Sequence, residues 1–230
     1  MSARLAIIPA RGGSKRLPRK NVLPFLGRPM IVHTIEAAAH SGCFGRIVVS
    51  TEDDEISGVA RGAGAHVHAR SSRLAGDEAA VVDVCLEVLD AEEREGRAHD
   101  TFVCLYATAP LRRAEDIAAV LSLIDDSHAF ALAATHYALP PHQALRVTAE
   151  GVLVPMWPEL VGRRASQIGP LVVDNGSTYA ARVADFRRVR SFYGPGLRGH
   201  VMPRERSVDI DEPADYDLAC WYAGRAQPAR

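Results

Sequence analysis

Residues 7–21 read IIPARGGSKRLPRKN. The first letters end an apolar run, residues 5–8, of the kind that forms a strand buried on both faces. Glycine, proline and cations follow, with five Lys or Arg side chains between positions 11 and 20. Gly12 and Gly13 allow a close backbone approach that a Cβ would prevent, so several N–H groups can point at phosphate oxygens. The segment therefore predicts a strand that ends in a binding loop for a polyphosphate nucleotide.

The alternative is a solvated basic loop without a ligand. The position of the loop argues against it, because open α/β sheets bind ligands where the first strand ends and an apolar helix follows. The segment lacks both the Gly-x-Gly-x-x-Gly pattern and the Gly-x-x-x-x-Gly-Lys-Ser/Thr pattern of common nucleotide-binding loops. Nucleotide binding at this loop would thus not follow either of those two patterns.

Alternating strands and helices are predicted over most of the chain. Short apolar runs predict strands, and apolar residues three or four apart predict helices. Further strands are expected at residues 46–51, 65–69, 101–106 and 130–135, and helices at 29–41, 52–62, 79–95 and 115–124. This order is typical of α/β proteins with a doubly wound, mostly parallel, Rossmann-like sheet.

Residues 139–170 differ in character from the rest of the chain. Five prolines interrupt any long helix there, and short alternating pieces suggest hairpin strands. A chain of 230 residues is long enough for one domain with a sizeable core. We expect a single domain over residues 1–230, from which residues 139–170 project as an arm.

Four carboxylates stand together at residues 52–55. They suit either a metal site or the start of a helix. Acidic side chains are common in a first helical turn because they interact favourably with the helix dipole. Helix capping is therefore the preferred interpretation.

Composition limits the classes of function. The formal net charge of -1 argues against a general nucleic-acid-binding protein, since duplex binders usually carry a strong positive excess. No apolar run reaches the roughly 20 residues that span a bilayer, and no signal-peptide pattern precedes the first strand. The four cysteines form no Cys-x-x-Cys pair, so neither a zinc site nor a disulfide framework is predicted. We expect a cytoplasmic protein with reduced thiols that binds neither membranes nor nucleic acid.

The order of residues 8–21, Ile-Pro-Ala-Arg-Gly-Gly-Ser-Lys-Arg-x-Pro-x-Lys-Asn, resembles the amino-terminal motif of the acylneuraminate cytidylyltransferases, the CMP-sialic acid synthetase family. The resemblance runs from about Leu5 to Asp217. It implies a nucleotide-diphospho-sugar transferase-like fold and CTP as the nucleotide. The residues of this motif that it assigns to CTP binding are Ala10, Arg11, Gly12, Gly13, Ser14, Lys15, Lys20 and Asn21.

Residues 70–77, RSSRLAGD, resemble a second family loop, Arg-Pro-x-x-Leu-Ala-x-Asp, in which the Arg reaches the nucleotide phosphates. Arg70 and Asp77 are the matching residues and are assigned to nucleotide binding. The family usually places Ser or Thr shortly after that Asp. This chain departs from the pattern, because residues 78–81 are Glu, Ala, Ala and Val and offer no hydroxyl.

Residues 106–110, Tyr-Ala-Thr-Ala-Pro, resemble the branch of the family that activates pseudaminic acid. The sialic acid branch has a Gln that touches the sugar where this chain has Tyr106, which makes N-acetylneuraminate a less expected substrate. Tyr106 and Thr108 are thus sugar-binding candidates. A core aromatic with a satisfied hydroxyl is the alternative interpretation of Tyr106.

In the resembling family, an arm such as residues 139–170 pairs with a second subunit, which implies a homodimer with active sites near the interface. Arg163, Arg164 and Gln167 match a segment that helps to hold the carboxylate and hydroxyls of the sugar. The planar guanidinium of Arg suits this task because it pairs bidentately with a carboxylate. The alternative is that both arginines are only surface charge.

Residues 172–179, VVDNGSTY, resemble the family's turn into a strand. Asp174 and Asn175 are candidates for orienting sugar hydroxyls. An ordinary Asn-Gly turn is an equally good interpretation.

Residues 208–215, VDIDEPAD, resemble the family's Asp-Ile-Asp-x-Pro-x-Asp. Residues two apart on an extended strand point the same way, so Asp209 and Asp211 would share one face while Ile210 turns into the core. Magnesium is usually held by one or two carboxylates together with phosphates and waters. The pair is therefore the candidate Mg²⁺ site.

The motifs together imply an enzyme that transfers CMP from CTP to the anomeric hydroxyl of a nine-carbon 2-keto sugar acid, such as pseudaminic, legionaminic or sialic acid, and releases pyrophosphate. The expected catalytic residues are Arg11, Lys20, Asp209 and Asp211, which would act by positioning and charge neutralisation. One alternative is a cytidylyltransferase for the eight-carbon acid Kdo, whose loop resembles Tyr-x-Ser-x-Arg-Leu-Pro-x-Lys. Another is a non-catalytic nucleotide-binding protein.

Overall fold

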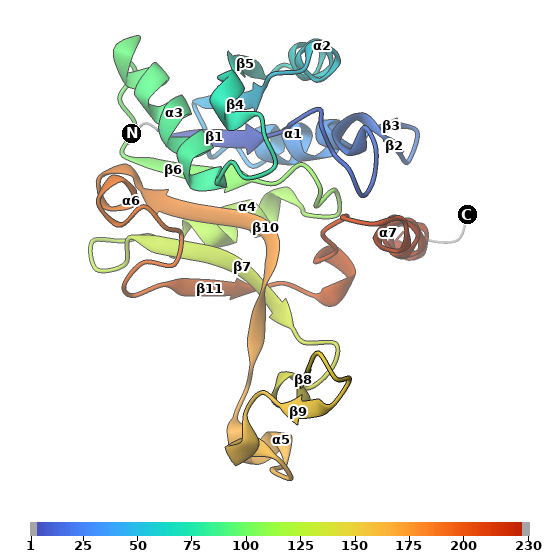
Figure 1. Cartoon of the computed structure of the whole chain (residues 1–230). Coiled ribbons are helices and arrows are strands. Elements are labelled where there is room, and N and C mark those ends of the chain that lie inside the picture. Colours follow the sequence, from blue (N-terminus) through green and yellow to red (C-terminus); the bar gives the residue numbers. More distant parts are fainter. Residues whose placement is uncertain (1–3, 227–230) are drawn as a thin grey trace.

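The computed structural model describes residues 4–226, which form a sheet body with an arm that extends from it (Figure 1). The strands are β1 (Arg4–Pro9), β2 (Pro24–Phe25), β3 (Arg28–Pro29), β4 (Arg46–Thr51), β5 (His66–Ala69), β6 (Thr101–Leu105), β7 (Phe130–His136), β8 (Leu145–Val147), β9 (Leu153–Pro155), β10 (Val172–Arg182) and β11 (Arg198–Val201). The α-helices are α1 (Met30–His40), α2 (Asp54–Gly62), α3 (Val81–Arg94), α4 (Ala114–Leu121), α5 (Ala165–Ile168), α6 (Val183–Val189) and α7 (Pro213–Ala226).

A seven-stranded sheet in the order β11-β7-β10-β6-β1-β4-β5 forms the centre of the body. β1 pairs in parallel with β4 and β6, whereas β10 runs antiparallel to both β6 and β7. The predicted α/β fold with a mostly parallel sheet is therefore confirmed. β11 was not predicted, because its Arg-Gly-His-Val sequence contains no apolar run.

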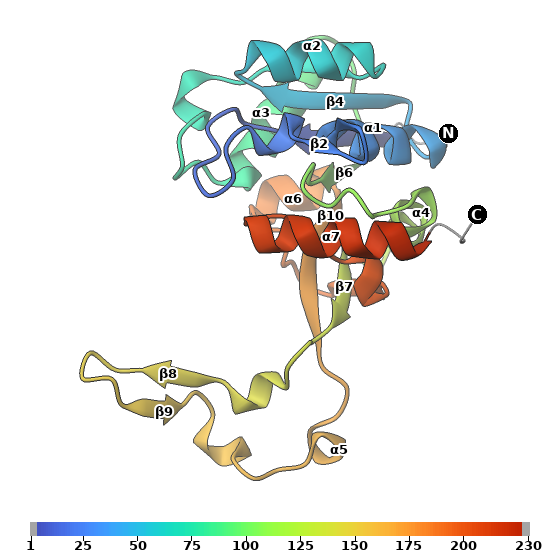
Figure 2. The ribbon, with the colours of Figure 1, turned by 90° about the vertical axis from the view of Figure 1, so that its right-hand side faces the viewer.

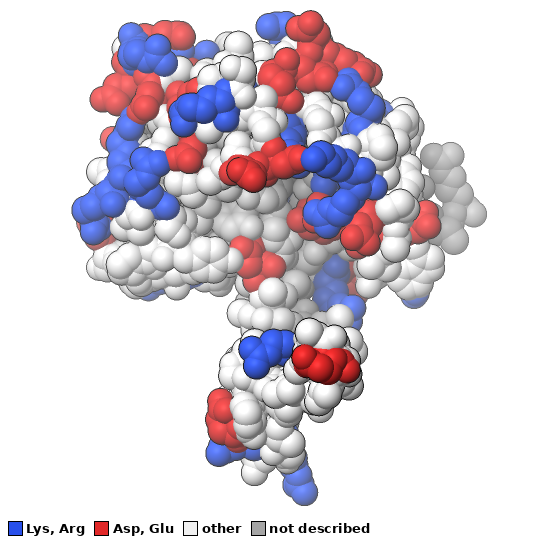
Figure 3. All heavy atoms as spheres, in the orientation of Figure 1, with Lys and Arg blue, Asp and Glu red and all other residues white. Residues whose placement is uncertain are grey.

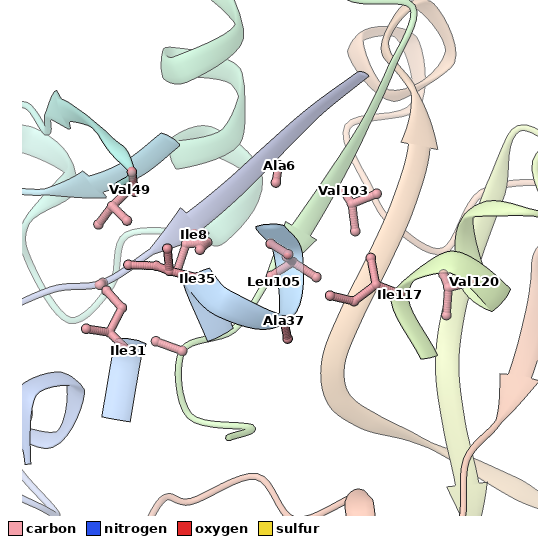
Figure 4. Packing of buried hydrophobic residues seen from close by; sticks show 14 of the residues in the cluster. Ala6, Ile8, Ile31, Ile35, Ala37, Val49, Val103, Leu105, Ile117 and Val120 are labelled. Atoms are coloured by element: carbon pink, nitrogen blue, oxygen red, sulfur yellow. The ribbon is translucent and has the colours of Figure 1, made fainter. Parts of the chain in front are cut away.

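Helices cover both faces of this sheet, and the sequence of β1 shows most clearly what this covering requires of a strand. Leu5 and Ile7 belong to one apolar cluster with α3 and α6, while Ala6 and Ile8 belong to another with α1 and α4. Alternate side chains of a strand point to opposite faces, so a strand covered on both faces must be apolar throughout. Figure 4 shows the second cluster, in which Ile35 of α1 and Ile117 of α4 lie against the sheet.

The arm connects the end of β7 to the start of β10 along the chain and extends away from the body (Figures 1 and 2). β8 and β9 pair there as an antiparallel hairpin, so the hairpin strands predicted within residues 139–170 are confirmed. The arm exposes many large apolar side chains: Leu139, Leu145, Val147, Val152, Leu153, Met156, Trp157 and Val161. Exposed apolar surface of this extent is typical of a site where another protein binds.

The surface of the sheet body carries charges of both signs. Figure 3 shows Lys and Arg side chains intermixed with Asp and Glu over the face that it presents. Among residues 4–226, no helix combines the length and the apolar character needed to cross a membrane. The four cysteines are free thiols, and Cys85 and Cys104 are buried.

Candidate active site

A pocket of about 270 Å³ opens where β1 and β6 end. The predicted site residues that line it are Arg11, Lys20, Asn21, Arg70, Tyr106, Thr108, Asp209 and Asp211. Those that do not line it are Ala10, Gly12, Gly13, Ser14, Lys15, Asp77, Arg163, Arg164, Gln167, Asp174 and Asn175. A larger cavity of about 560 Å³ lies near His99 and Arg182, at the start of β6, and none of the candidate residues lines it.

Two hydrogen bonds hold the binding loop to the sheet and to its own start. The Ala10 N–H donates to the Ser50 carbonyl at 3.0 Å. The buried Asn21 side chain donates from Nδ2 to the Arg11 carbonyl at 2.8 Å. The Nδ2 atom of Asn21 thus shapes the loop, while the residue also lines the pocket.

Gly12 packs against the start of α2. Its N–H donates to Glu52 Oε1 at 2.7 Å, and a Cβ at this position would collide with the Asp53 carboxylate. Asp53 Oδ1 accepts the Ile56 N–H at 3.0 Å and caps the helix, so the capping interpretation of residues 52–55 is confirmed. Glycine is therefore needed at position 12 because the loop packs closely against the acidic start of α2.

Asp77 pairs with two cations of the binding loop, Arg11 and Lys15. Hydrogen bonds from Lys15 and then from Arg11 lower the pKa of Asp77. Exposed ion pairs of this kind contribute little to stability, so another anion can replace the carboxylate at small cost. Asp77 thus occupies the place near Arg11 that a phosphate could take.

Arg70 lies largely buried at the edge of the pocket. Its Nη2 donates to the Ser50 carbonyl at 2.6 Å, and its Nη1 lies 3.9 Å from Glu52 Oε2. Burial lowers the pKa of Arg70, and the charge of Glu52 opposes that change. The guanidinium is therefore a preformed positive charge facing the pocket.

Asp211 receives two cations from the binding loop. Lys20 Nζ and Arg16 Nη2 each lie 2.6 Å from its carboxylate oxygens. Burial alone would raise the pKa of Asp211, but hydrogen bonds and charges from Lys20 and Arg16 hold it below its usual value. Asp211 therefore brings an ionised carboxylate next to the loop.

Asp209 is more deeply buried than Asp211. Its Oδ1 accepts the Thr108 hydroxyl, and Gly176 lies so close that a Cβ there would stand 2.6 Å from Oδ2. Burial raises the pKa of Asp209, and the nearby charge of Asp211 adds to this effect. A cation between the two carboxylates would relieve their repulsion.

The segment that carries both carboxylates is not a strand, so that part of the prediction is wrong. Ile210 N–H donates to the Thr108 carbonyl at 2.8 Å, outside any ladder of the sheet. Ile210 is completely buried, as predicted, and Asp209 and Asp211 both line the pocket. The hydrogen bond to Thr108, and not strand pairing, therefore holds Asp209 and Asp211 toward the pocket and Ile210 toward the core.

Tyr106 combines the two interpretations that the sequence left open. Its ring packs 5.4 Å from the Tyr179 ring, centroid to centroid, and it also lines the pocket. None of residues 4–226 forms a hydrogen bond with its hydroxyl in this structure. Burial raises the pKa of Tyr106, so the hydroxyl stays protonated and can donate to a ligand.

Asp174 and Asn175 use their polar atoms inside the protein. The Asp174 carboxylate accepts hydroxyls from Tyr179 and Tyr193. Asn175 Nδ2 donates to Ser207 Oγ at 3.1 Å, and the residue is 5% exposed. The following glycine marks an irregularity within β10 and not a hairpin turn, because the strand pairs with β7 on both sides of it. Neither residue lines the pocket, and these contacts occupy polar atoms of the side chains that we had assigned to sugar hydroxyls.

Arg163, Arg164 and Gln167 lie on the arm and are not brought to this pocket. Gln167 Oε1 accepts the Arg164 N–H at 2.8 Å, and Arg163 Nε donates to the Glu159 carbonyl at 3.2 Å. All three residues are exposed. A contact between them and a sugar would therefore require a ligand held by a second subunit.

Three residues that shape the pocket were not predicted from the sequence to do so: Glu52, Arg112 and Gly176. Glu52 was classed with the acidic helix start, and Gly176 with an ordinary turn. Arg112 follows the Tyr106–Pro110 motif by two residues, but its burial was not predictable because Arg is mostly exposed in proteins. Their contacts join segments far apart in the sequence, so no local signal could have found them.

The pocket suits a divalent cation. Asp209 and Asp211 are its acidic lining residues, and neither His nor Cys lines it. No group of three or more His, Cys, Asp or Glu residues that could hold a metal occurs among residues 4–226. Two carboxylates without a closed cage of ligands match the oxygen-rich, partly open sites that Mg²⁺ takes beside phosphates.

A sequence model of a protein family described as cytidylyltransferase matches residues 5–147. A pseudaminic acid cytidylyltransferase from Campylobacter jejuni is 32% identical over 217 residues, which cover 94% of each chain. A CMP-N,N'-diacetyllegionaminic acid synthase from Legionella pneumophila is 34% identical over 218 residues, which cover 93% of each chain. An N-acylneuraminate cytidylyltransferase from Streptococcus agalactiae is 32% identical over 92% of this chain and 51% of its own length.

Solved structures show the same fold at lower identity. A CMP:2-keto-3-deoxy-manno-octonic acid synthetase complexed with CTP has a TM-score of 0.73 and 19% identity, covering 98% of this chain and 100% of its own. A 4-diphosphocytidyl-2C-methyl-D-erythritol synthase has a TM-score of 0.70 and 12% identity, covering 97% of this chain and 100% of its own. These two likenesses concern the fold alone.

Proposed function

Because this chain belongs to the cytidylyltransferase family, we propose that it transfers CMP from CTP to the anomeric hydroxyl of a nine-carbon 2-keto sugar acid. The observation that carries the proposal is one pocket in which the cations of the binding loop meet Asp209 and Asp211. Three relatives at 32% to 34% identity are named for nine-carbon acids: pseudaminic, diacetyllegionaminic and N-acylneuraminic acid. They support this substrate class without selecting one member.

CTP would bind over the loop that follows β1. Its phosphates would take the place of the Asp77 carboxylate beside Arg11 and Lys15, while Arg70 and Lys20 face them from within the pocket. Such an exchange keeps each cation paired before and after binding, so the protein needs little rearrangement. Preformed charges of this kind stabilise a transition state without reorganisation.

Asp209 and Asp211 are the residues that would hold Mg²⁺. When bound, the ion would neutralise phosphate charge and orient the phosphate oxygens. Asp211 would have to share its carboxylate with Lys20, which lies 2.6 Å away. Lys20 thus stands between the loop and the metal site and could follow the phosphates.

The reaction would be an in-line displacement at the α-phosphorus. A bond forms from the anomeric oxygen to the α-phosphorus, and the bond from that phosphorus to the α,β-bridging oxygen breaks. Pyrophosphate leaves with the electron pair, and the proton of the sugar hydroxyl passes to water. Positioning and charge stabilisation account for most of the catalysis in transfers of this type.

Tyr106 and Thr108 are the residues of this pocket that we propose for sugar recognition. Tyr106 has an unbonded hydroxyl at the pocket wall, and Thr108 already donates to Asp209. Arg163, Arg164 and Gln167 would contribute only across a subunit interface. Their role in sugar binding therefore depends on the formation of a homodimer.

The apolar arm supports a homodimer, because a second copy would cover side chains such as Leu153, which is 59% exposed. Sedimentation equilibrium is expected to give twice the 24.9 kDa mass of one chain. Leu153→Asp should shift the mass toward that of one chain, whereas Leu26→Asp, 50% exposed but outside the arm, should not. A single-chain mass for the unmodified protein at micromolar concentration would contradict the proposal.

Pyrophosphate release tests the reaction itself. CTP, UTP, ATP and GTP would each be combined, with Mg²⁺, with N-acetylneuraminate, pseudaminic acid, legionaminic acid, the deaminated nonulosonate and Kdo. We expect release with CTP and at least one nine-carbon acid, and none with Kdo. Release with Kdo alone would show an eight-carbon substrate, and CTP binding without release from any pair would favour a binding protein.

A further inference from the structure

Arg112 is a buried cation behind the pocket and is 3% exposed. It forms no ion pair with any carboxylate in the part of the chain that the structure describes, and its Nε has no hydrogen-bond partner there. Burial lowers the pKa of Arg112 to about 10, which leaves it charged at neutral pH. An unpaired buried charge is a poor source of stability, so its presence calls for another explanation.

The guanidinium of Arg112 joins three elements of the fold. Nη1 donates to the Ser177 carbonyl of β10 at 2.6 Å, and Nη2 donates to Thr34 Oγ1 of α1 at 2.9 Å. Both nitrogens also lie 3.3 Å from the Tyr106 carbonyl, just after β6. The Tyr106 N–H itself donates to the Ser177 carbonyl at 3.0 Å. Arg112 therefore binds both residues of the hydrogen bond that joins the end of β6 to β10.

Both contacts of the Asp209 carboxylate begin at this junction. Thr108 stands two residues after Tyr106, donates its hydroxyl to Asp209 and accepts the Ile210 N–H. Gly176 immediately precedes Ser177 and packs against the Asp209 carboxylate. A shift of either backbone segment would therefore move Asp209.

We propose that Arg112 is a positioning residue, which fixes the backbone at Tyr106 and Ser177 so that Thr108 and Gly176 hold the Asp209 carboxylate in the pocket. It touches no substrate and acts only through these contacts. The catalytic consequence rests on the proposed function, while the chain of contacts does not. Displacement of a reacting group by about 1 Å can lower a rate about 100-fold, so small movements at this junction are sufficient.

The test compares Arg112→Lys and Arg112→Met with Arg113→Met, a change at the adjacent, exposed arginine. Lys keeps the charge but has a single nitrogen, which cannot reach acceptors on three elements at once. We expect Arg112→Lys to lower kcat about 30-fold with the KM for CTP changed less than about threefold, and Arg112→Met to lower kcat further. Arg113→Met should retain the unmodified kcat and KM.

Hydrogen exchange followed by mass spectrometry gives a readout that needs no substrate. In Arg112→Lys, exchange should rise in peptides covering residues 105–109 and 208–211, where the Tyr106 and Ile210 amides are bonded, and stay unchanged elsewhere. A uniform rise, with kcat falling only in proportion to the folded fraction, would overturn the proposal by showing a general structural role. Unchanged exchange and unchanged kcat in Arg112→Lys would overturn it as well.

A double-mutant cycle tests the route through Thr108. Arg112→Lys and Thr108→Val are expected to lower kcat together by less than the product of their separate effects, because both loosen Asp209. Multiplicative effects would overturn the proposed route.

If Arg112→Met does not fold, the role of Arg112 is tested with Arg112→Lys and with Thr34→Val, which removes one acceptor of the guanidinium. Should the unmodified protein be inactive with every sugar acid, the proposed function fails, and the exchange pattern still decides the role of Arg112.

Discussion

Replacing Asp211 with asparagine is expected to lower kcat about 100- to 1000-fold, the range seen when one preorganised charge-stabilising group is removed from an active site. Asn is neutral and a poorer ligand for a hard divalent cation, and it cannot neutralise Lys20 and Arg16. The fold should persist, because the ion pairs of Asp211 are partly exposed and contribute little to stability. The Asp211 N–H also keeps its hydrogen bond to Asp215 Oδ2, at 3.0 Å, in the variant.

The measurement is steady-state pyrophosphate release at increasing Mg²⁺ concentration. Asp217→Asn is the matched control, since it makes the same chemical change at an exposed position of α7. We expect Asp211→Asn to need more Mg²⁺ for half-maximal rate, and Asp217→Asn to behave like the unmodified enzyme. A kcat for Asp211→Asn within about threefold of the control would remove this carboxylate from the active site.

The second large effect is expected at Gly176, where alanine should lower kcat about 100-fold by displacing the Asp209 carboxylate. The new Cβ would stand 2.6 Å from Asp209 Oδ2, which is closer than a Cβ packs in real structures, and 3.1 Å from Asp209 Cγ. Gly176 also has a φ of +68°, which L residues adopt only with strain. The variant therefore combines a backbone penalty with a steric one.

Gly196 separates the two penalties. It has the same φ of +68°, but a Cβ there would meet nothing closer than His128 Cδ2 at 3.7 Å. Each alanine variant should lose about 1 kcal/mol of stability from the backbone conformation, which is a few degrees in Tm. Only Gly176→Ala should lose kcat through displacement of the Asp209 carboxylate. The kcat of Gly196→Ala should stay within about twofold of the unmodified value. Equal kcat values for the two variants would show that Gly176 does not position Asp209.

The elements that were predicted well are those whose signal is local. Residues 46–51 form β4 with the predicted bounds, because a short apolar run rich in β-branched residues between polar segments favours a strand covered on both faces. Asp53 caps α2 because a carboxylate just before a helix finds an unpaired N–H within three residues. The expected helices at 29–41, 79–95 and 115–124 correspond to α1, α3 and α4, with ends that differ by a few residues.

The failures involve pairing between distant segments. Nothing in residues 172–182 indicates that β10 lies antiparallel between β6 and β7, and the Asn175-Gly176 pair looks like a turn although it interrupts a continuous strand. Asp209 and Asp211 lie at the binding loop, as the sequence motif predicted. The predicted strand pairing is wrong, however, because the segment is held by the hydrogen bond from the Ile210 N–H to the Thr108 carbonyl and not by a sheet ladder. Asn175 looked available to a ligand, yet its amide is consumed by Ser207, 32 residues further along the chain.

The sequence by itself determined the binding loop after the first strand, the alternation of strands and helices, and the candidate pair of carboxylates. Each of these depends on side-chain volume, charge and backbone freedom within a few consecutive residues. Only the tertiary structure decided which polar atoms remain free for a ligand and which, such as Arg112 and Asn175, are spent on holding the pocket together. The physical reason is that a buried polar group must find its partner wherever packing places one, and for Arg112 and Ser177 that partner lies 65 residues away.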